Sequence, residues 1–435
     1  MTEPATPKRT LTSQELSWIL YDVANSAFAL TVVTTVMPIF FSSVAEADGL
    51  TPQRATALWG YTNSVASVVL AVSAPVLGTL ADYPGNKRRM FIGFFAVGLL
   101  MCVLFSTIGL GQWRYAMALS VLAFIGYAGA NLFYDAFLPD VVQGDDPSRL
   151  DTISTYGYAW GYIGSILPFG VALVFILNPD LVGGTLNATR LSFIITAVWW
   201  AGFTIPMLRN VRQTHTIAPA PNPLRSTGRR LMGTLRHVRD NRNVLIFLLA
   251  YFFYIDGVGT IYKMAAIYGA EIGLEQSSLI TAILVVQIVA FPFALLFGWL
   301  SAKVGPKTML LVGICIYFVI VSIGFFIPVL PAGQQVPAFW GMAMLVGSAQ
   351  GGIQALSRSF FGSLIPPERA GEFYGIYNIF GKFAAILGPL LLAIMADLTG
   401  ASRYGVLSIA VLFFIGGVLL LFVRRDEPAV GVHTS

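Results

Sequence analysis

The sequence predicts an all-α integral membrane protein with twelve transmembrane helices in two pseudo-symmetric six-helix bundles. Composition indicates the class, because 56% of the residues are hydrophobic and only 11% are charged, against about 25% charged in a soluble domain. The apolar residues fall into about twelve runs, each long enough to cross a hydrocarbon core of ~30 Å. A sequence repeat at an offset near 220 residues predicts the symmetry.

The predicted spans follow one another in order, mostly with short polar connections between them. Each run holds about 20 or more predominantly apolar residues, the length that an α-helix needs to cross a bilayer. The spans are expected at 17–44, 55–82, 89–110, 113–138, 151–178, 188–208, 243–270, 277–302, 307–330, 337–364, 371–397 and 402–423.

Polar segments divide these spans into six and six. A polar tail at 1–16 precedes the first bundle, 17–208. A long, basic and proline-containing linker at 209–242 separates it from the second bundle, 243–423, and a short tail at 424–435 ends the chain. Because the first apolar run is too long for a cleavable signal peptide and lacks a small-residue cleavage site, we expect it to remain as an anchor.

Basic residues predict the orientation, since Lys and Arg gather on the cytoplasmic side of a membrane protein. With the N-terminus inside, the inner connections hold 19 of the 26 Lys and Arg residues and the outer connections hold four. Both termini are therefore expected to be cytoplasmic. This topology signal accounts for the net charge of +5 without a nucleic-acid partner. Twenty arginines against six lysines favour a GC-rich bacterial genome, and hence the bacterial cytoplasmic membrane.

Two pairs of segments carry the repeat. Segment 78–87 after the second span resembles 298–307 after the eighth, with glycine, leucine, glycine and lysine in register. Segment 161–168 in the fifth span resembles 381–389 in the eleventh. Because each half holds six spans and the offset is shared, the halves are predicted to be parallel repeats.

The first of these loops carries a family resemblance. Gly78-x-Leu80-Ala81-Asp82-x-x-Gly85-x-Lys87-Arg88 resembles the loop signature between helices 2 and 3 of the major facilitator superfamily. The second copy has Ala302 where the aspartate would stand. The resemblance implies the major facilitator fold, with any charge relay built on that aspartate confined to the first half.

The opening of the first span narrows the resemblance to one branch. The segments 15–28, 133–140 and 256–268 resemble a branch that includes the fungal vacuolar amino-acid effluxers linked to autophagy. This resemblance implies a polytopic secondary transporter, with amino acids as the implied solutes. We expect it to work in the lipid bilayer as a monomer, without a cofactor.

Ionisable residues inside the predicted spans indicate which helices face water. They are Asp22, Asp135, Asp256, Lys263, Arg358 and Lys382, whereas spans 3, 6, 9 and 12 hold none in their interiors. Since lipid-facing helices cannot easily hold charges, spans 1, 4, 7 and 10 are predicted to line a central aqueous path.

Two sets of residues are candidates for function. Asp256 lies ~18 Å along its span by helical rise, near the membrane midplane, where either a functional charge or a permanent structural pair with Lys263 or Lys382 is expected. Uncharged polar residues on facing helices could contact substrate or only join helices, each bond then giving about 0.6 kcal/mol. The candidates for binding substrate or a coupling ion are Asp256, Lys263, Lys382, Asn378, Gln350, Gln354, Tyr158 and Asn131.

The second set consists of gate and latch candidates nearer the cytoplasmic ends of the spans. Asp135 and Arg358 are expected to form a cytoplasmic gate pair, with an interfacial snorkelling arginine as the alternative. Asp22 and Asn25 are expected to belong to the same gate or entry. The loop residues Asp82, Lys87 and Arg88 are predicted to form an interdomain latch.

Other classes of protein lack their signatures here. No phosphate-binding G-x-x-x-x-G-K-[ST] motif occurs, and all three histidines fall in the linker or the tail, so we expect neither an enzyme nor a metal site. The prediction is a secondary transporter that moves a small polar, zwitterionic solute by alternating access, with protons as the candidate coupling ion. Prolines at 168, 292 and 389 are expected to let three spans bend. The alternative is a non-transporting receptor or scaffold on a transporter fold.

Overall fold

The computed structural model describes residues 10–142, 147–218, 233, 236, 238–271, 276–384 and 387–424. Within these ranges the secondary structure is entirely helical. Helices suit an apolar chain in lipid, because each helix satisfies its own backbone N–H and C=O groups.

The N-terminal half holds the first six predicted spans. Span 1 is divided into α1 (Ser13–Phe28), the π-helical segment η1 (Ala29–Thr35) and α2 (Val36–Glu46). The other helices of this half are α3 (Pro52–Ala81), α4 (Asn86–Leu104), α5 (Trp113–Ala136), the short α6 (Leu138–Val141), α7 (Pro147–Leu177) and α8 (Thr185–Asn210).

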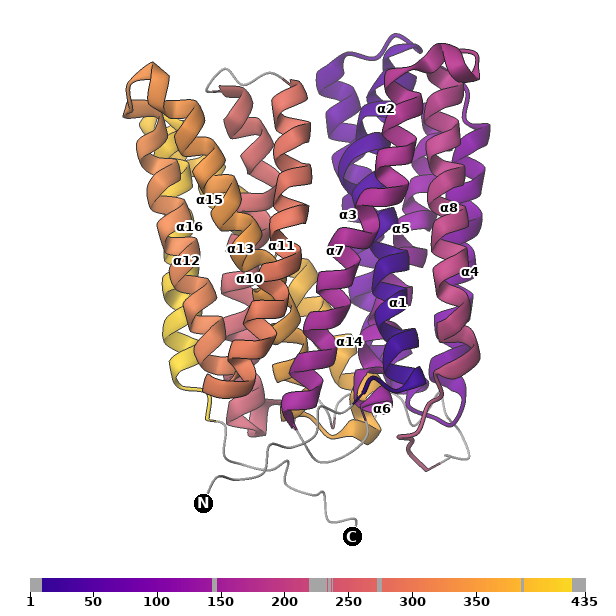
Figure 1. Ribbon diagram of the computed structural model, residues 1–435, viewed down its shortest axis with the longest axis vertical. Coiled ribbons are helices and arrows are strands. Elements are labelled where there is room, and N and C mark those ends of the chain that lie inside the picture. The colour runs from indigo at the N-terminus through magenta and orange to yellow at the C-terminus, as the bar shows by residue number, and fades with distance from the viewer. Residues whose placement is uncertain are drawn as a thin grey trace.

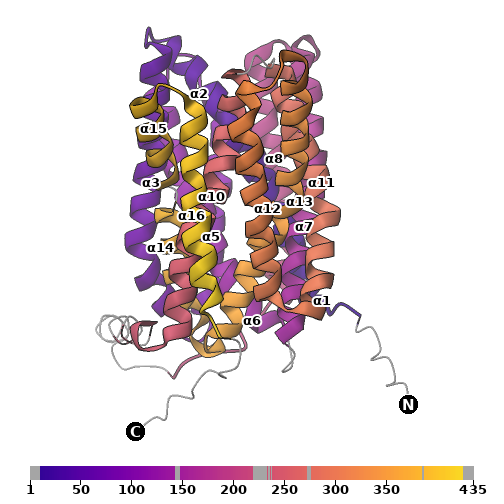
Figure 2. The same ribbon diagram turned by 90° about the vertical axis from the view of Figure 1, so that its left-hand side faces the viewer.

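The C-terminal half repeats this layout. Its helices are α10 (Arg242–Glu271), α11 (Gln276–Val304), α12 (Pro306–Phe326), α13 (Ala332–Leu364), α14 (Ala370–Phe383), α15 (Leu387–Thr399) and α16 (Ser402–Leu421). Figure 1 shows the two halves side by side, with α7 and α11 adjacent at the boundary. Figure 2 shows α1 beginning and α16 ending at the same end of the bundle, which we call the terminal side.

Ten helices in the described part of the chain are long and apolar enough to cross a membrane. The remaining two predicted spans, 337–364 and 371–397, coincide with α13 and with the α14–α15 pair. The protein is thus a multi-pass membrane protein with the predicted all-α fold.

Each half has its own hydrophobic core. The N-terminal core packs around Trp18, Phe28 and Trp200, all fully buried. The C-terminal core packs around Tyr254 and Phe413. Because each core is nearly complete within its own half, the halves can move against each other with limited loss of core packing.

The halves meet where two glycines let helices approach closely. A Cβ atom at Gly78 of α3 would overlap the backbone of Gly371 in α14. A Cβ atom at Gly298 of α11 would overlap the side chain of Thr155 in α7. Small residues commonly allow such close contact between membrane helices. The two glycines belong to the two copies of the predicted repeat and lie at equivalent helix crossings, α3 with α14 and α11 with α7.

Two spans depart from the predicted uniform helices. In span 1 the π-helical segment is accompanied by hydrogen bonds from the side-chain hydroxyls of Thr34 and Thr35 to the carbonyls five residues earlier, with Thr34 Oγ1 2.9 Å from Ala29 O. In span 11, α14 ends at Phe383 and is followed by a turn at Ala384, close to the predicted bend at Gly388 and Pro389. Pro168 and Pro292, by contrast, lie inside continuous helices.

Candidate functional site

A cavity of about 380 Å³ lies between the two halves. Its described lining comes from spans 1, 4, 5, 7, 8, 10 and 11, and none of it from α4, α8, α12 or α16, which form predicted spans 3, 6, 9 and 12. Hydroxyl and amide groups dominate the surface. The tyrosines are Tyr127, Tyr134, Tyr158, Tyr162, Tyr251, Tyr262 and Tyr377, and the amides are Asn25, Asn131, Gln287, Gln350, Gln354 and Asn378.

Arg358 of α13 forms the charged end of this cavity on the terminal side. Arg358 is only 2% exposed. Nη2 lies 3.2 Å from Asp22 Oδ2, and Nη1 lies 3.3 Å from Asp135 Oδ1. The guanidinium is also 4.5 Å from the ring centroids of both Trp18 and Tyr158, a cation–π arrangement. One cation of the C-terminal half therefore joins two carboxylates of the N-terminal half.

Further hydrogen bonds hold this ion cluster in place. Arg358 donates from Nε to Ser154 Oγ at 2.9 Å and from Nη2 to the Ser154 carbonyl at 3.0 Å. Asp22 accepts from the Tyr134 hydroxyl at 2.8 Å and from Asn25 Nδ2 at 3.3 Å. A buried charge needs such compensation, because removing one partner leaves the other uncompensated.

Two acceptor atoms at the cavity are without a hydrogen-bond donor among the described residues. They are the carbonyl oxygens Asn131 Oδ1 on α5 and Gln350 Oε1 on α13. Buried polar atoms are usually satisfied by protein, water or ligand. The cavity therefore offers one open acceptor from each half to a donor on a bound molecule.

The structure brings most of the predicted site residues together. Five of the predicted substrate or ion residues line the cavity: Asn378, Gln350, Gln354, Tyr158 and Asn131. The gate candidates Asp22, Asn25, Asp135 and Arg358 line the same cavity. The side chains of two further predicted substrate or ion residues, Lys263 and Lys382, lie outside the part of the chain that the structure describes. The residues predicted to bind and those predicted to gate thus line one cavity.

Asp256, another predicted substrate or ion residue, is buried beside the cavity lining. It is 1% exposed and is absent from the described lining of the cavity. Its carboxylate accepts from the backbone N–H of Gly388 at 2.9 Å and from the Thr260 hydroxyl at 3.3 Å. Asp256 therefore lies outside the described lining of the central cavity, and its side chain points toward the start of α15. Carboxylates are favoured at helix N-termini by the free N–H groups and the helix dipole.

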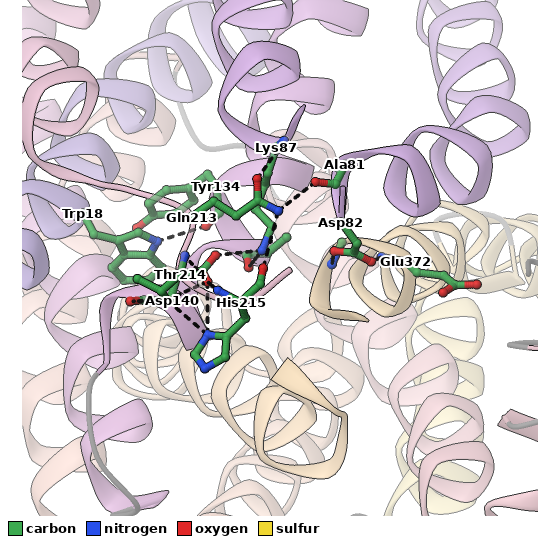
Figure 3. Close-up of polar contacts among 12 residues, drawn as sticks. Trp18, Ala81, Asp82, Lys87, Tyr134, Asp140, Gln213, Thr214, His215 and Glu372 are labelled. Atoms are coloured by element: carbon green, nitrogen blue, oxygen red, sulfur yellow. Dashed lines mark hydrogen bonds and ion pairs between the residues drawn. The ribbon is translucent and has the colours of Figure 1, made fainter. Parts of the chain in front are cut away.

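Asp82 joins the halves on the terminal side, as expected of a latch. Its oxygens accept from the backbone N–H groups of Gly371 at 2.7 Å and Glu372 at 2.9 Å, at the start of α14 (Figure 3). Burial raises the pKa of Asp82 to about 7, against the opposing effect of the Lys87 ammonium and the two N–H donors.

Lys87 and Arg88 bind within the N-terminal half instead of across the halves. The Lys87 ammonium lies 2.7 Å from Asp140 Oδ2, and Arg88 donates to the Leu208 carbonyl. The predicted latch therefore crosses between the halves through Asp82 alone of these three loop residues. Lys87 is fully buried, so its contact with Asp140 fixes the loop that carries Asp82.

The first residues of the linker also bind to this loop cluster, a feature with no signal in the sequence. Asp140 Oδ1 accepts from the backbone N–H groups of Thr214 and His215 at 3.0 and 2.8 Å (Figure 3). Burial opposes ionisation of Asp140, but Lys87 and His215 outweigh it and hold the pKa of Asp140 below its usual range. The hydrogen bond to Asp140 raises the pKa of His215.

Two helical bundles with separate cores, a polar cavity between them and ion pairs that join them on one side define a secondary transporter of the major facilitator class. The sequence of the chain also identifies its family within this class. A family model described as "Vacuole effluxer Atg22 like" matches residues 10–430. The chain belongs to this Atg22-like family of major facilitator transporters, as the resemblance implied.

Relatives agree with this assignment. The chain is 43% identical over 418 residues to "Uncharacterized MFS-type transporter YxiO" of Bacillus subtilis (strain 168), covering 95% of this chain and 96% of that protein. It is 25% identical to "Autophagy-related protein 22" of Coccidioides immitis (strain RS), covering 84% of this chain and 72% of the relative.

Solved structures share the fold at low identity. The proton:xylose symporter XylE superposes with a TM-score of 0.71 at 13% identity, covering 96% of each chain. A bacterial homologue of the iron transporter ferroportin, in an outward-facing state, gives a TM-score of 0.64 at 15% identity, covering 94% of this chain and 98% of the other. The chain therefore has the major facilitator fold.

Proposed function

We propose that this transporter moves a small zwitterionic solute of the amino-acid type by alternating access, with protons as the coupling ion. The observation that supports this most directly is the buried Arg358, which bridges Asp22 and Asp135 beside a cavity rich in hydroxyls and amides. A cation with two carboxylates presents both signs of charge to one bound molecule.

The solute carboxylate would bind Arg358 in place of one of the two aspartates. Guanidinium and carboxylate form strong paired hydrogen bonds, so this exchange retains the charge compensation that burial demands. The solute ammonium would then donate to the displaced aspartate and to the open acceptors Asn131 Oδ1 and Gln350 Oε1. These acceptors favour a donor-rich group over a second carboxylate.

Cavity size favours a small solute. About 380 Å³ lies near the lower end of the roughly 300–1,000 Å³ that small-molecule sites span. A single amino acid suits this volume better than a peptide or a lipid. The tyrosine hydroxyls supply hydrogen bonds for its polar groups, while their rings can contact its side chain.

Coupling follows from the same three charges. Arg358 belongs to one half, and Asp22 and Asp135 belong to the other. Protonation of one aspartate, or its displacement by solute, weakens a bond that holds the halves together on the terminal side. Binding of solute and proton then shifts the population toward a state that is open on that side.

Orientation and location complete the proposal. The excess of basic residues in the connections of the terminal side favours the cytoplasm for that side. We accordingly place the protein in a bacterial cytoplasmic membrane as a monomer. The name of the family, vacuole effluxer, supports movement of a solute across the membrane, and the proton:xylose symporter shares the fold.

Solute exchange in proteoliposomes tests the proposal. Vesicles loaded with one of a panel of amino acids are assayed for uptake of the labelled compound, with and without a pH gradient. We expect exchange of at least one amino acid, abolished in Arg358→Lys because lysine cannot bond both aspartates as a planar fork does. The matched control is Arg114→Lys, an exposed arginine on the opposite side.

Asp135→Asn tests the coupling ion separately. We expect it to retain exchange at equal pH on both sides and to lose uptake driven by a pH gradient. Asp180→Asn, on an exposed segment of the opposite side, serves as its control. Exchange that is unchanged in Arg358→Lys would contradict the assigned solute contact.

A further inference from the structure

We infer that Asp151 is a second latch between the halves, the pseudo-symmetric counterpart of the Asp82 latch with the carboxylate moved to the opposite helix. Asp151 lies near the start of α7 and is 3% exposed. Its Oδ1 accepts from the Ser359 hydroxyl at 2.6 Å, and its Oδ2 accepts from the Ser301 hydroxyl at 2.8 Å. Both serines belong to the C-terminal half.

The repeat relates the two latches residue by residue. At an offset of 220 residues, Asp82 at the end of α3 corresponds to Ala302 at the end of α11, and Gly371 of α14 corresponds to Asp151 of α7. The first crossing thus carries its carboxylate on α3, and the second carries it on α7. The second loop has Ala302 in place of the aspartate, and the carboxylate of that crossing lies on the facing helix α7 instead.

Close packing at both crossings supports this equivalence. Gly78 stands four residues before Asp82 and meets the backbone of Gly371. Gly298 stands at the equivalent place and meets Thr155, one helical turn after Asp151. Each carboxylate therefore lies beside the glycine contact of its own crossing.

Burial explains why Asp151 would respond to opening. In this structure its carboxylate is shielded from water and accepts two hydroxyls from the other half. When the halves separate on the terminal side, those bonds break and the carboxylate becomes hydrated. Hydrogen bonds to a charged, buried group contribute more than neutral ones, so this contact favours the state closed on the terminal side.

Spin-label distances test the inference without any solute. Labels are placed at Arg209→Cys and Arg424→Cys, exposed positions of the two halves on the terminal side, after Cys102→Ala and Cys315→Ala. We expect Asp151→Ala to raise the ratio of open to closed molecules by about tenfold or more, because hydrogen bonds to a charged group contribute more free energy than neutral ones. Asp151→Asn, which keeps an acceptor oxygen, is expected to give an intermediate shift.

The serine partners make the test specific. Ser301→Ala with Ser359→Ala should shift the ratio at least as far, because the buried carboxylate is then left without these two donors, and adding Asp151→Ala should shift it no further. Ser363→Ala is the control, since the Ser363 hydroxyl bonds the Phe360 carbonyl of its own helix. If Asp151→Ala fails to fold, the double serine variant still decides the outcome.

An unchanged distance distribution in the serine double variant, or fully additive shifts, would overturn the latch. The inference rests on the alternating-access part of the proposed function and not on the solute. Because the distances are recorded without solute, failure here would leave the assignment of an amino-acid solute standing, and failure of solute exchange would leave the latch standing.

Discussion

Arg358 is almost completely buried, and its charge is tolerated only because two carboxylates and a serine surround it. Breaking such a buried cluster by removing one member is costly, whereas removing every charge together is often nearly neutral. The stability of the closed state and the binding of solute therefore depend on the same guanidinium, and neutral replacements can separate the two roles.

Arg358→Ala should lower the free energy of unfolding by about 3–5 kcal/mol, because Asp22 and Asp135 are left as uncompensated buried charges. Replacing all three, with Asp22→Asn, Asp135→Asn and Arg358→Gln, should restore most of that loss while solute exchange stays absent. Thermal unfolding in detergent measures the first effect and proteoliposome exchange the second. A triple variant less stable than Arg358→Ala would contradict the electrostatic explanation.

His215 gives a pH dependence to the loop cluster. Because Asp140 raises the pKa of His215 above its ordinary 6.5, the protonated form is favoured in the folded state. Its contribution is complete below the ordinary pKa and is lost as the pH rises through the raised value. The Tm difference between wild type and His215→Gln should therefore shrink from about pH 6 to about pH 9. A difference that is constant or grows over this range would contradict the ion pair.

At the scale of elements, the break in span 11 is stabilised by α10. The Asp256 carboxylate accepts the N–H of Gly388 near the start of α15, and a Cβ atom at Gly388 would overlap Thr260. The conformation of this helix pair therefore depends on an acceptor at position 256 and on the absence of a side chain at position 388.

Asp256→Asn should retain most stability and solute exchange, because asparagine caps a helix about as well as aspartate. Asp256→Leu should cost about 1–3 kcal/mol, since the Gly388 N–H is then left without this buried acceptor. Thermal unfolding and exchange measured on the two variants check this. Loss of exchange in Asp256→Asn with normal stability would show that Asp256 carries a coupling charge after all.

These elements show what sequence could and could not predict. Helical rise predicts the depth of Asp256 but not its direction around the helix axis, and in the structure its carboxylate contacts Gly388 near the start of α15. The predicted pair of Asp135 and Arg358 is present in the structure, because charges of opposite sign at similar depth need each other in a membrane. The partners of Asp82 are backbone N–H groups, which every residue except proline has, and so no side-chain pattern identifies them.

Asp151 likewise has no signal in the sequence. It stands at the edge of a predicted span, where a carboxylate looks like an ordinary loop residue. Only comparison with Gly371 through the repeat, together with the serines Ser301 and Ser359, distinguishes it. The π-helical segment of span 1 likewise has no apolar pattern of its own, since its residues are apolar or threonine on every face.

At the scale of the whole molecule, four carboxylate contacts between the halves, among the residues that the structure describes, have the same polarity. The carboxylates Asp22, Asp82, Asp135 and Asp151 all belong to the N-terminal half, and the C-terminal half supplies the donors. Opening the terminal side exposes all four carboxylates to water together. The balance between the two states should therefore depend on pH on that side.

Asp82 sets one part of this dependence. Its pKa is raised to about 7 in the closed state and should return toward its ordinary 3.8 when hydrated, so the closed state binds more protons between these values. Opening is then favoured as the pH rises toward 7. In the closed state the Lys87 ammonium lowers the pKa of Asp82, and the Glu372 carboxylate raises it. The spin-label distances should show this shift in wild type and lose it in Asp82→Asn. An equal pH response in both proteins would contradict it.

The central claim is that one solute must present a carboxylate to Arg358 and an ammonium to the acceptors of both halves. The most direct measurement is exchange in proteoliposomes of an amino acid found in the panel, compared with the amine that lacks its carboxylate and the acid that lacks its ammonium. We predict rapid exchange of the amino acid, and exchange of neither analogue above the level of Arg358→Lys. Exchange of the amine or of the acid as fast as the amino acid would contradict the claim.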